Sequence, residues 1–533
     1  MNISTGPAAL LKASTIAMLM ATGFSGFAQA QTVLKYAPSA EPRIMDPVVT
    51  TAAVVQQHAY LIYDTLISLD ENLEPQPQML EGWTTSEDGK TYTMTLREGL
   101  TFHDGSPVAI VDVIASINRW AQRDPHGVRL VSLGMKLEEV DARTFTVTLD
   151  KPTNLVIIGF GKMSASALFI MREEEAANTP ATESVTTFIG SGPYRFVTDE
   201  YRPGATMVYE KFEEYVPRDE PASYFAGGKV ANIDRIEWLI MPDATTAVSA
   251  LETGEIQAYE SPPIDLVPVL QLNEDLVVRP LGNLGQFGYL RPNFLHPPFD
   301  KVEARQALAL LTDQTEVLSV AAGEDPSNWE VCYSFFSCGG VNENDAGTEH
   351  LHPRNVEKAK ELLEQAGYNG EPIVLLVPGD NVVLNAFASV VEPRLREGGL
   401  NIDAQYSDFS TMLSRRNNRD TTDKGGWSLF PMWNYTFEAD NPIHAAYYNM
   451  SCDGNAFFGW YCSEEIEALK GEWVLATSEE ERKAAASRIQ EIMARDLPII
   501  PLGKFSVPFA FSTKLDGLLD TPIPVFWNAT LND

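Results

Sequence analysis

Basic residues, cysteines and long apolar runs are all scarce in this sequence. Its 533 residues include 39 Lys and Arg against 73 Asp and Glu, which gives a formal net charge of −34. A chain this acidic repels the phosphate backbone, and no Lys/Arg-rich stripe is visible, so nucleic-acid binding is not expected. A solvated surface explains the acidity. The alternative explanation, that the acidic residues attract a cationic ligand, stays open. The net charge alone cannot decide it, because it does not show where a binding site lies.

Only one long apolar run occurs, and it lies near the N-terminus. The first thirty residues contain no acidic residue and end in Ala28-Gln29-Ala30, which predicts a secretory signal cleaved before Gln31. The run is shorter than the about 20 apolar residues that span a bilayer, so the mature protein is not expected to span a membrane. The first cysteine is Cys332, so no lipid anchor is predicted at the cleavage site. We therefore expect a periplasmic protein.

The four cysteines fall into two local pairs, Cys332/Cys338 and Cys452/Cys462. In an exported protein this number favours disulfides, and three pairings are possible. Local closure within each pair is the simplest, and each bridge would then stiffen its own short loop. A redox or metal site lacks support, because the sequence contains no C-x-x-C motif.

Motifs of catalysis and cofactor binding are missing. The sequence has no H-E-x-x-H, no G-x-S-x-G and no G-x-x-x-x-G-K-[ST], which argues against a zinc protease, a serine hydrolase and a P-loop ATPase. His350 and His352 have metal-ligand spacing, but a solvated loop explains them better. We therefore expect a binding protein rather than an enzyme, with no cofactor and no metal.

Two kinds of strand pattern occur in different parts of the chain. Thr91–Arg97 and Thr144–Leu149 alternate apolar residues with Thr, which predicts half-buried, antiparallel strands. Ile373–Val377 is a continuous apolar run, as in a parallel strand covered on both faces. The pattern therefore predicts an α/β chain with a β-rich first third and a βα-type second half.

Helical spacing and capping signals predict the main helices. Asp300 with Glu303 resembles a capping box, and the helix it would open carries one apolar face through Ala304, Leu308, Leu311, Thr315 and Leu318. Further helices are predicted over Val108–Trp120, Thr245–Thr253 with Gly254 as a C-terminal stop, Asn355–Gly367, and from the Ser478/Glu481 box to Asp496.

Several sequence blocks occur together in a characteristic order. They are Leu80–Pro107 (with Thr101-Phe-His-Asp-Gly-Ser-Pro107), Asp112-Val113 with Ser116, Gly190-Ser-Gly-Pro-Tyr-Arg-Phe196, Leu251–Ile256, Pro298-Phe299, Arg305–Leu308, Ala359–Tyr368 and Pro498–Leu502. This series resembles the family 5 extracellular solute-binding proteins, the dipeptide-, oligopeptide- and nickel-binding group of ABC importers. The resemblance extends over essentially the whole mature chain.

The resemblance implies a two-lobed, α/β periplasmic-binding-protein clamp with an additional inserted β-rich domain, the class II-like arrangement of cluster C. Domain I would comprise 31–70, 190–283 and 500–533, domain II would be 71–189, and domain III, the second lobe, 284–499. Crossing strands between the lobes are placed near Arg279–Gly288 and Leu497–Lys504.

The same resemblance implies a function. The protein would capture a peptide or similar small polar solute between its lobes and deliver it, as a monomer, to an ABC permease at the inner membrane. Alternatives are a receptor for a non-peptide ligand, such as an opine or sugar conjugate or a metal chelate, and a chemosensory binding protein. A periplasmic enzyme is the least favoured.

Family peptide binders hold the ligand's amino group with an Asp in a W-x-x-D…D-P region. Thr436 stands three residues after Trp433 here, so Glu438 or Asp440 becomes the candidate for that charge. Asp440 as a helix cap is equally compatible with the pattern. The remaining candidates are aromatic cleft walls or cationic contacts for a carboxylate or phosphate: Trp427, Trp433, Tyr435, Tyr36, Arg43 and Arg415-Arg416. The alternative for the aromatic residues is packing in the core, and the alternative for Arg415-Arg416 is a position on a surface helix. The Cys452/Cys462 pair matches a disulfide of dipeptide-binding relatives.

Overall fold

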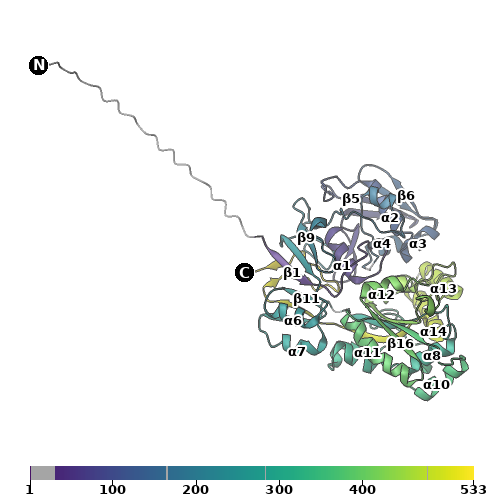
Figure 1. Ribbon diagram of the computed structural model, residues 1–533. Coiled ribbons are helices and arrows are strands. Elements are labelled where there is room, and N and C mark those ends of the chain that lie inside the picture. The colour runs from purple at the N-terminus through teal and green to yellow at the C-terminus, as the bar shows by residue number, and fades with distance from the viewer. Residues whose placement is uncertain (2–30, 164–165, 283, 477, 533) are drawn as a thin grey trace. The chain divides into compact units, whose positions relative to one another are not determined.

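The computed structural model describes residues 1, 31–163, 166–282, 284–476 and 478–532 (Figure 1). The predicted signal segment up to Ala30 lies outside the described residues, apart from Met1. Residue contacts divide the chain after Gln31, and the architecture below is that of the unit beginning at Thr32. Among the described helices, none combines the length and the apolar character needed to cross a bilayer.

A seven-stranded sheet collects strands from the beginning, the middle and the end of the chain. Its order is β12-β19-β11-β1-β10-β9-β8, with β1 parallel to both of its neighbours and the other pairs antiparallel. The strands are β1 (Val33–Ala37), β8 (Tyr194–Phe196), β9 (Thr206–Lys211), β10 (Arg235–Leu239), β11 (Ala258–Glu260), β12 (Leu276–Arg279) and β19 (Phe509–Ser512). With it go the helices α1 (Ala53–Ile62), α6 (Ala244–Glu252) and α7 (Val267–Leu270) and the small pairs β2 (Ile67–Leu69) with β3 (Pro75–Pro77) and β20 (Leu515–Asp516) with β21 (Thr530–Leu531).

The segment between β3 and β8 forms a four-stranded antiparallel sheet of its own. Its strands are β4 (Leu80–Thr85), β5 (Thr91–Leu96), β6 (Lys136–Glu139) and β7 (Thr144–Thr148), in the order β4-β5-β7-β6. Met94 of β5 lies opposite Phe145 of β7, and both are buried. The two predicted alternating strands are thereby confirmed as an antiparallel pair. The helices here are α2 (Ile110–Trp120), α3 (Pro125–Ser132), α4 (Leu155–Gly161) and α5 (Glu173–Asn178).

A six-stranded mixed sheet, ordered β14-β18-β13-β17-β15-β16, organises the second half of the chain. The strands are β13 (Gln286–Pro292), β14 (Trp329–Glu330), β15 (Ile373–Pro378), β16 (Ile402–Ser407), β17 (Leu429–Tyr435) and β18 (Ile500–Phe505). Every residue of β15 is buried and its two partners run parallel to it, as its apolar run predicts. The helices are α8 (Val302–Leu311), α9 (Gln314–Ala322), α10 (Val356–Gln365), α11 (Val382–Glu397), α12 (Phe409–Arg415), α13 (Glu464–Leu475) and α14 (Glu479–Asp496).

The chain passes twice between the two large sheets. We call the part built on the seven- and four-stranded sheets lobe 1 and the part built on the six-stranded sheet lobe 2. The first crossing joins β12, which ends at Arg279, to β13, which begins at Gln286, inside the predicted stretch. The second, residues 506–508, joins β18 to β19. The predicted stretch Leu497–Lys504 ends before this crossing and lies largely in β18 of lobe 2, so that prediction was placed too early in the chain. A Cβ on Gly285 would stand 2.8 Å from the carbonyl oxygen of Phe505, at the end of β18, and 3.2 Å from Ser506 Oγ, so the two crossings approach closely there.

Most predicted helix boundaries are confirmed. The Ser478 side chain accepts a hydrogen bond from the backbone N–H of Glu481, and the Glu481 side chain caps in return, so the predicted capping box opens α14. Asn355 caps α10 by accepting from Lys358 N–H. Gly254 follows α6 with a positive φ of 75°.

The predicted helix start at Asp300 is wrong. Helix α8 begins at Val302 after Lys301, whose side chain makes no capping bond. The single apolar face through Thr315 is also wrong, because α8 ends at Leu311 and the Asp313 side chain opens α9 by accepting from Glu316 N–H. A side chain that accepts a hydrogen bond from a free N–H of the first turn favours a new helix start at that point. The chain direction changes between α8 and α9, and Thr315 is exposed to solvent.

Both disulfides close locally. Cys332 is bonded to Cys338 and Cys452 to Cys462, which confirms the predicted pairing, and the described residues contain no free cysteine.

Candidate ligand site

A cavity lies between segments of the two lobes, and we call it the interlobe cavity. Its lining comes from lobe 1 through Ser39, Ala40, Thr51, Ala53, Val54 and Gln56, and from lobe 2 through Asn381, Phe409, Met432, Trp433, Asn434, Tyr435 and Glu438. Ligands favour such interfaces because one molecule can contact both sides at once.

Neighbouring cavities extend the interlobe cavity along the same interface. One shares Ser39, Asn381 and Trp433 with it and adds Glu260. Another shares Tyr435 and is otherwise lined largely by the two crossing segments. The candidate site therefore lies beside the crossings, where a change of backbone angle alters its width.

The floor of the interlobe cavity follows from the register of two strands. In the antiparallel pair β13–β17, Tyr289 lies opposite Met432 and Arg291 opposite Phe430, and directly opposed residues share a face. Alternation along β17 puts Asn434 on that face as well. Tyr289 and Arg291 therefore share a sheet face with Met432 and Asn434, while residues of both faces of β17 line the cavity, since Trp433 and Tyr435 belong to the lining as well.

Glu438 is a buried carboxylate at this floor. It lies in the 3₁₀ turn Thr436–Ala439 that follows β17. Asn434 donates from Nδ2 to Glu438 Oε2 at 2.5 Å, and Tyr289 donates from its hydroxyl to Asn434 Oδ1 at 2.8 Å. Asn434 thus uses its donor and its acceptor to join Tyr289 to Glu438 and fixes the carboxylate.

A second buried carboxylate, Glu260, ends β11. It accepts hydrogen bonds from the Tyr36 hydroxyl at 2.8 Å, from Gln57 Nε2 at 2.7 Å and from Ser39 N–H at 2.9 Å. Burial, and then the negative charge of Glu260, raises the pKa of Tyr36. Burial and the Glu260 and Glu438 carboxylates raise the pKa of Tyr435 in the same way. These phenols therefore stay protonated and act as donors.

The structure brings three of the predicted site residues together. Trp433, Tyr435 and Glu438 all line the interlobe cavity. Tyr36 is fully buried, and its ring packs against Trp238 at 5.6 Å, so it supports Glu260 from within the lobe 1 core.

The other predicted residues lie elsewhere. Trp427 is fully buried and donates from Nε1 to the backbone oxygen of Arg416, as a core residue does. Asp440 lines a separate cavity, where burial raises its pKa. It follows the 3₁₀ turn that contains Glu438 and caps no helix start. Arg43 is about half exposed and makes ion pairs with Glu41 and Asp408.

The two adjacent arginines have different roles. Arg415 donates to the backbone oxygens of Gly425 and Gly426 and holds their loop. Arg416 is buried and donates to Thr51 Oγ1 of lobe 1 at 3.3 Å. Arg291 is the one charged residue of β13, and it is buried like the rest of that strand.

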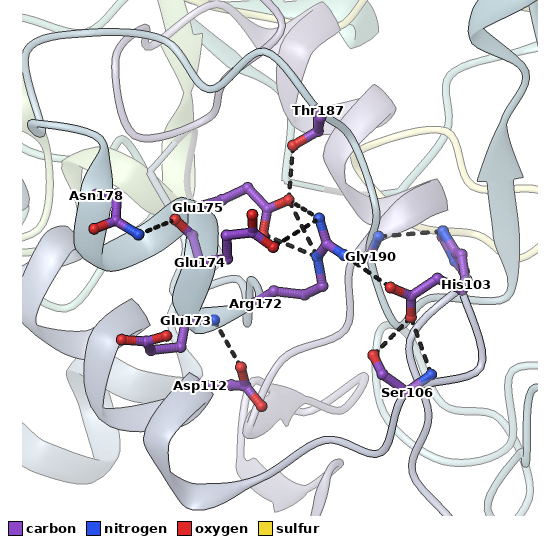
Figure 2. A network of polar contacts seen from close by, with 11 residues as sticks. His103, Ser106, Asp112, Arg172, Glu173, Glu174, Glu175, Asn178, Thr187 and Gly190 are labelled. Atoms are coloured by element: carbon purple, nitrogen blue, oxygen red, sulfur yellow. Dashed lines mark hydrogen bonds and ion pairs between the residues drawn. The ribbon is translucent and has the colours of Figure 1, made fainter.

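Two of the sequence blocks that resemble the family, Leu80–Pro107 and Gly190–Phe196, contact each other within lobe 1. His103 Nδ1 accepts from Gly190 N–H at 3.2 Å, and its Nε2 contacts the Gly192 oxygen at 3.1 Å, so Nε2 carries the proton (Figure 2). Burial lowers the pKa of His103 to about 4, which keeps the ring neutral. A Cβ on Gly190 would stand 1.7 Å from the Ile62 oxygen, so only glycine allows this approach to α1.

Arg172 is the centre of the same network (Figure 2). It pairs with Asp104 at 2.8 Å and with Glu175, whose Oε1 also accepts from Thr187 at 2.7 Å. Asp112 accepts from Glu173 N–H and ties α2 to α5. Arg172 is thus paired with protein carboxylates, so the network is a structural joint.

No cluster of three or more His, Cys, Asp or Glu suited to a metal ion occurs among the described residues. His352 stacks on Tyr333 with 4.0 Å between ring centroids.

Comparison with known proteins places this architecture in a family. The model of the bacterial extracellular solute-binding proteins, family 5, matches residues 74–456. A probable peptide ABC transporter periplasmic-binding protein, y4tO of Sinorhizobium fredii, is 41% identical over 493 residues, 91% of each chain. The dipeptide-binding protein DppE of Bacillus subtilis is 24% identical over 91% of this chain and 88% of its own.

Solved structures agree on the fold. The binding protein AgaA of A. tumefaciens R10, in complex with agropinic acid, covers 94% of this chain and 99% of its own with a TM-score of 0.79 at 21% identity. A dipeptide-binding protein of Pseudoalteromonas sp. SM9913, in complex with Met-Leu, covers 94% and 100% with a TM-score of 0.77 at 20% identity. Both are two-lobed binding proteins, and this chain belongs to the family 5 extracellular solute-binding proteins of ABC importers.

Proposed function

We propose that this protein captures a short peptide, or a similar small polar solute, in the interlobe cavity and delivers it to the permease of an ABC importer. The observation that carries the proposal is the lining of this cavity, to which both lobes contribute. A ligand that contacts both lobes stabilises the closed arrangement over the open one, which gives the permease a state to recognise.

The chemistry of the lining favours a peptide. Gln56 and Asn434 offer amides, Glu438 offers a carboxylate, and Trp433 and Tyr435 add aromatic surface. Amides match a peptide backbone, aromatic surface takes side chains, and a buried carboxylate suits an ammonium group. The names of the relatives y4tO and DppE support the same ligand class.

Three further properties belong to the proposal. The protein acts as a binding protein without catalysis, as its relatives' names imply. It works as a monomer in the periplasm, after cleavage before Gln31 and without a lipid anchor. Its domains are those expected from the family, with domain I at 31–70, 190–283 and 500–533, domain II at 71–189 and domain III at 284–499, except that β18 (Ile500–Phe505) pairs in the six-stranded sheet and is assigned to domain III. The separate four-stranded sheet supports the inserted domain II.

The test is thermal unfolding of the purified protein with peptides of two to six residues, with agropinic acid and with nickel. Binding to the native state alone raises the melting temperature, and at a free ligand concentration about 100 times Kd the gain is about 2.7 kcal/mol. We expect stabilisation by peptides, with the peptide recovered intact after incubation. Stabilisation by the opine alone, or by nickel alone, would overturn the peptide proposal, and loss of the peptide would overturn the absence of catalysis.

A further inference from the structure

A second cavity between the lobes lies at α4, and we call it the α4 cavity. It has a volume of about 240 Å³, is larger than the interlobe cavity and shares no lining residue with it. The first turn of α4 lines it from the inserted segment of lobe 1. From lobe 2, the end of α13, the start of α14 and the loops at Val341 and Asp440 line it. The α4 cavity is therefore a separate space, to which both lobes contribute.

Direct bonds hold the two walls of the α4 cavity together. Lys162 follows α4 and donates from Nζ to the backbone oxygen of His444 in lobe 2 at 3.1 Å. The Nε2 of His444 bonds the backbone oxygen of Met163 in return, also at 3.1 Å. Lys162 and His444 are both buried. One end of α4 thus lines the cavity while the other end is bonded to the facing lobe, so the cavity has fixed walls.

Asp440 brings a carboxylate to the α4 cavity without a basic partner. Burial raises the pKa of this carboxyl group, and among the described residues only a hydrogen bond with the Val341 backbone lowers it. No basic side chain of the described residues forms an ion pair with Asp440. Since a desolvated carboxylate gains most from a positive charge beside it, Asp440 offers a place for an ammonium group.

Two donors with unused capacity line the same cavity. Trp473 is 8% exposed, and its buried indole Nε1 has no acceptor among the described residues, so its desolvation stays uncompensated. The Arg482 guanidinium carbon lies 5.7 Å from the centroid of the Trp473 ring, and its Nη2 makes only a long bond of 3.4 Å to the Ala476 oxygen. The neighbouring Lys483, by contrast, pairs with Glu479 at 2.8 Å. Trp473 and Arg482 therefore offer donors for a carboxylate.

The rest of the lining used here is aliphatic, and the cavity is small. Leu155 and Ile158 come from lobe 1, and Val341 and Val474 from lobe 2. Pockets that hold drug-sized ligands measure roughly 300–1,000 Å³, so a cavity of about 240 Å³ suits a smaller solute. Its size and lining fit a molecule that carries one aliphatic group and both kinds of charge.

We infer that the α4 cavity is a second solute site, which takes a free amino acid with an aliphatic side chain. The ammonium group pairs with Asp440, and the carboxylate accepts from Trp473 Nε1 and from Arg482. Because the structure leaves Asp440 and Arg482 without an ion pair, a zwitterion completes both, whereas a ligand with a single charge completes one. The inference goes beyond the proposed function and does not require it, since the two cavities share no lining residue.

The decisive test compares three probes with one side chain, by isothermal titration of the wild-type protein: L-leucine, L-leucinamide and N-acetyl-L-leucine. Leucine should bind at least about tenfold more tightly than either derivative, because each derivative lacks one of the two charges. D440N should weaken leucine to a similar extent. E480Q, at an exposed position of α14, is the matched control with wild-type affinity. Equal affinities of the three probes, or no binding of leucine, isoleucine or valine, would overturn the inference.

A second measurement locates the bound amino acid. The indole N–H resonance of Trp473, assigned by its loss in W473F, should shift when leucine is added to the wild-type protein. The shift should persist when a stabilising peptide saturates the interlobe cavity. A resonance that stays in place although leucine binds, or a shift that the peptide abolishes, would assign leucine to another site and overturn the inference. If D440N does not fold, the three probes and this resonance still decide with the wild-type protein alone.

The same data distinguish failure of the second site from failure of the proposed function. Leucine binding that depends on Asp440, in a protein that binds no peptide, would support the second site and reject the peptide proposal. Peptide binding without leucine binding would do the reverse. A peptide that itself shifts the Trp473 resonance would show that the α4 cavity receives the end of a longer ligand, and this too would overturn the inference of a site for a free amino acid.

Discussion

Arg172 in lobe 1 and the arginines Arg291 and Arg416 in lobe 2 place the same side chain in opposite surroundings. Arg172 pairs with Asp104 and Glu175, and these carboxylates raise its pKa (Figure 2). Burial without an acid lowers the pKa of Arg291 and of Arg416 to about 10, so both stay charged at neutral pH. Protein acids pair with Arg172, whereas no ion pair with an acid is found for Arg291 or Arg416 among the described residues.

The largest expected loss of stability comes from removing the acidic partner of a buried arginine. D46N removes the charge opposite the buried Arg119 and weakens the bond from Val185 N–H. Breaking one side of a buried pair costs about 3–5 kcal/mol of the free energy of unfolding, measured by urea denaturation. E472Q, at the exposed pair with Arg488, is the control and should cost less than about 1 kcal/mol. Equal small losses in both variants would contradict the role assigned to Asp46.

Next in size is the loss of the acid at the cavity floor. E438Q keeps the shape of the side chain but removes its charge, so a peptide with a free amino group should bind roughly 10- to 100-fold more weakly, about 1.5–3 kcal/mol. Isothermal titration checks this, with D440N as the control because Asp440 lines a separate cavity. An affinity that falls in D440N and not in E438Q would reverse the assignment.

Acid should weaken the structural joint around His103. The folded ring has a pKa of about 4 because it is buried, against about 6.5 in the unfolded chain, so unfolding takes up a proton between these values. Stability is therefore lost as the pH falls from about 6.5 toward 4, by up to about 1.4 kcal/mol per pH unit for this residue. H103Q should show a correspondingly shallower pH dependence in urea denaturation. A parallel pH dependence in both proteins would exclude His103 as a source.

The smallest effect is expected at the rim of the same network. T187V removes one neutral donor to Glu175 while Arg172 stays in place, so the loss should be about 0.5–1.5 kcal/mol. Urea denaturation measures it, and ligand affinity should stay at the wild-type value. Weaker peptide binding by this variant would show that the Arg172 network affects the interlobe cavity, and would contradict the purely structural role assigned to it.

Local signals in the sequence predicted local structure well. The alternation in β5 and β7, the apolar run of β15 and the Ser478 capping box each depend on residues close in sequence. The capping box predicted at Asp300 and Glu303 does not form. The two residue types alone do not determine where a helix begins, and the side chain of Asp313 instead caps the start of α9.

The candidate site was predicted in part, for a physical reason. Trp433, Tyr435 and Glu438 are close in sequence to the region that the family uses, and they line the cavity together. The link from Thr51 to Arg416 spans 365 positions, and the opposition of β13 and β17 joins residues more than 130 apart. Such pairings follow from sheet register, which a single sequence does not display.

The two crossings leave and re-enter lobe 1 on strands that are direct partners, since β12 pairs with β19 and Arg279 lies opposite Phe509. In topological terms, everything from β13 to β18 takes the place of the turn in a β-hairpin. Two connecting segments that start side by side restrict translation of lobe 2 relative to lobe 1 and allow rotation more easily. The interlobe cavity lies beside these segments, so a small change of angle in them opens or closes its walls without disturbing the interior of either sheet.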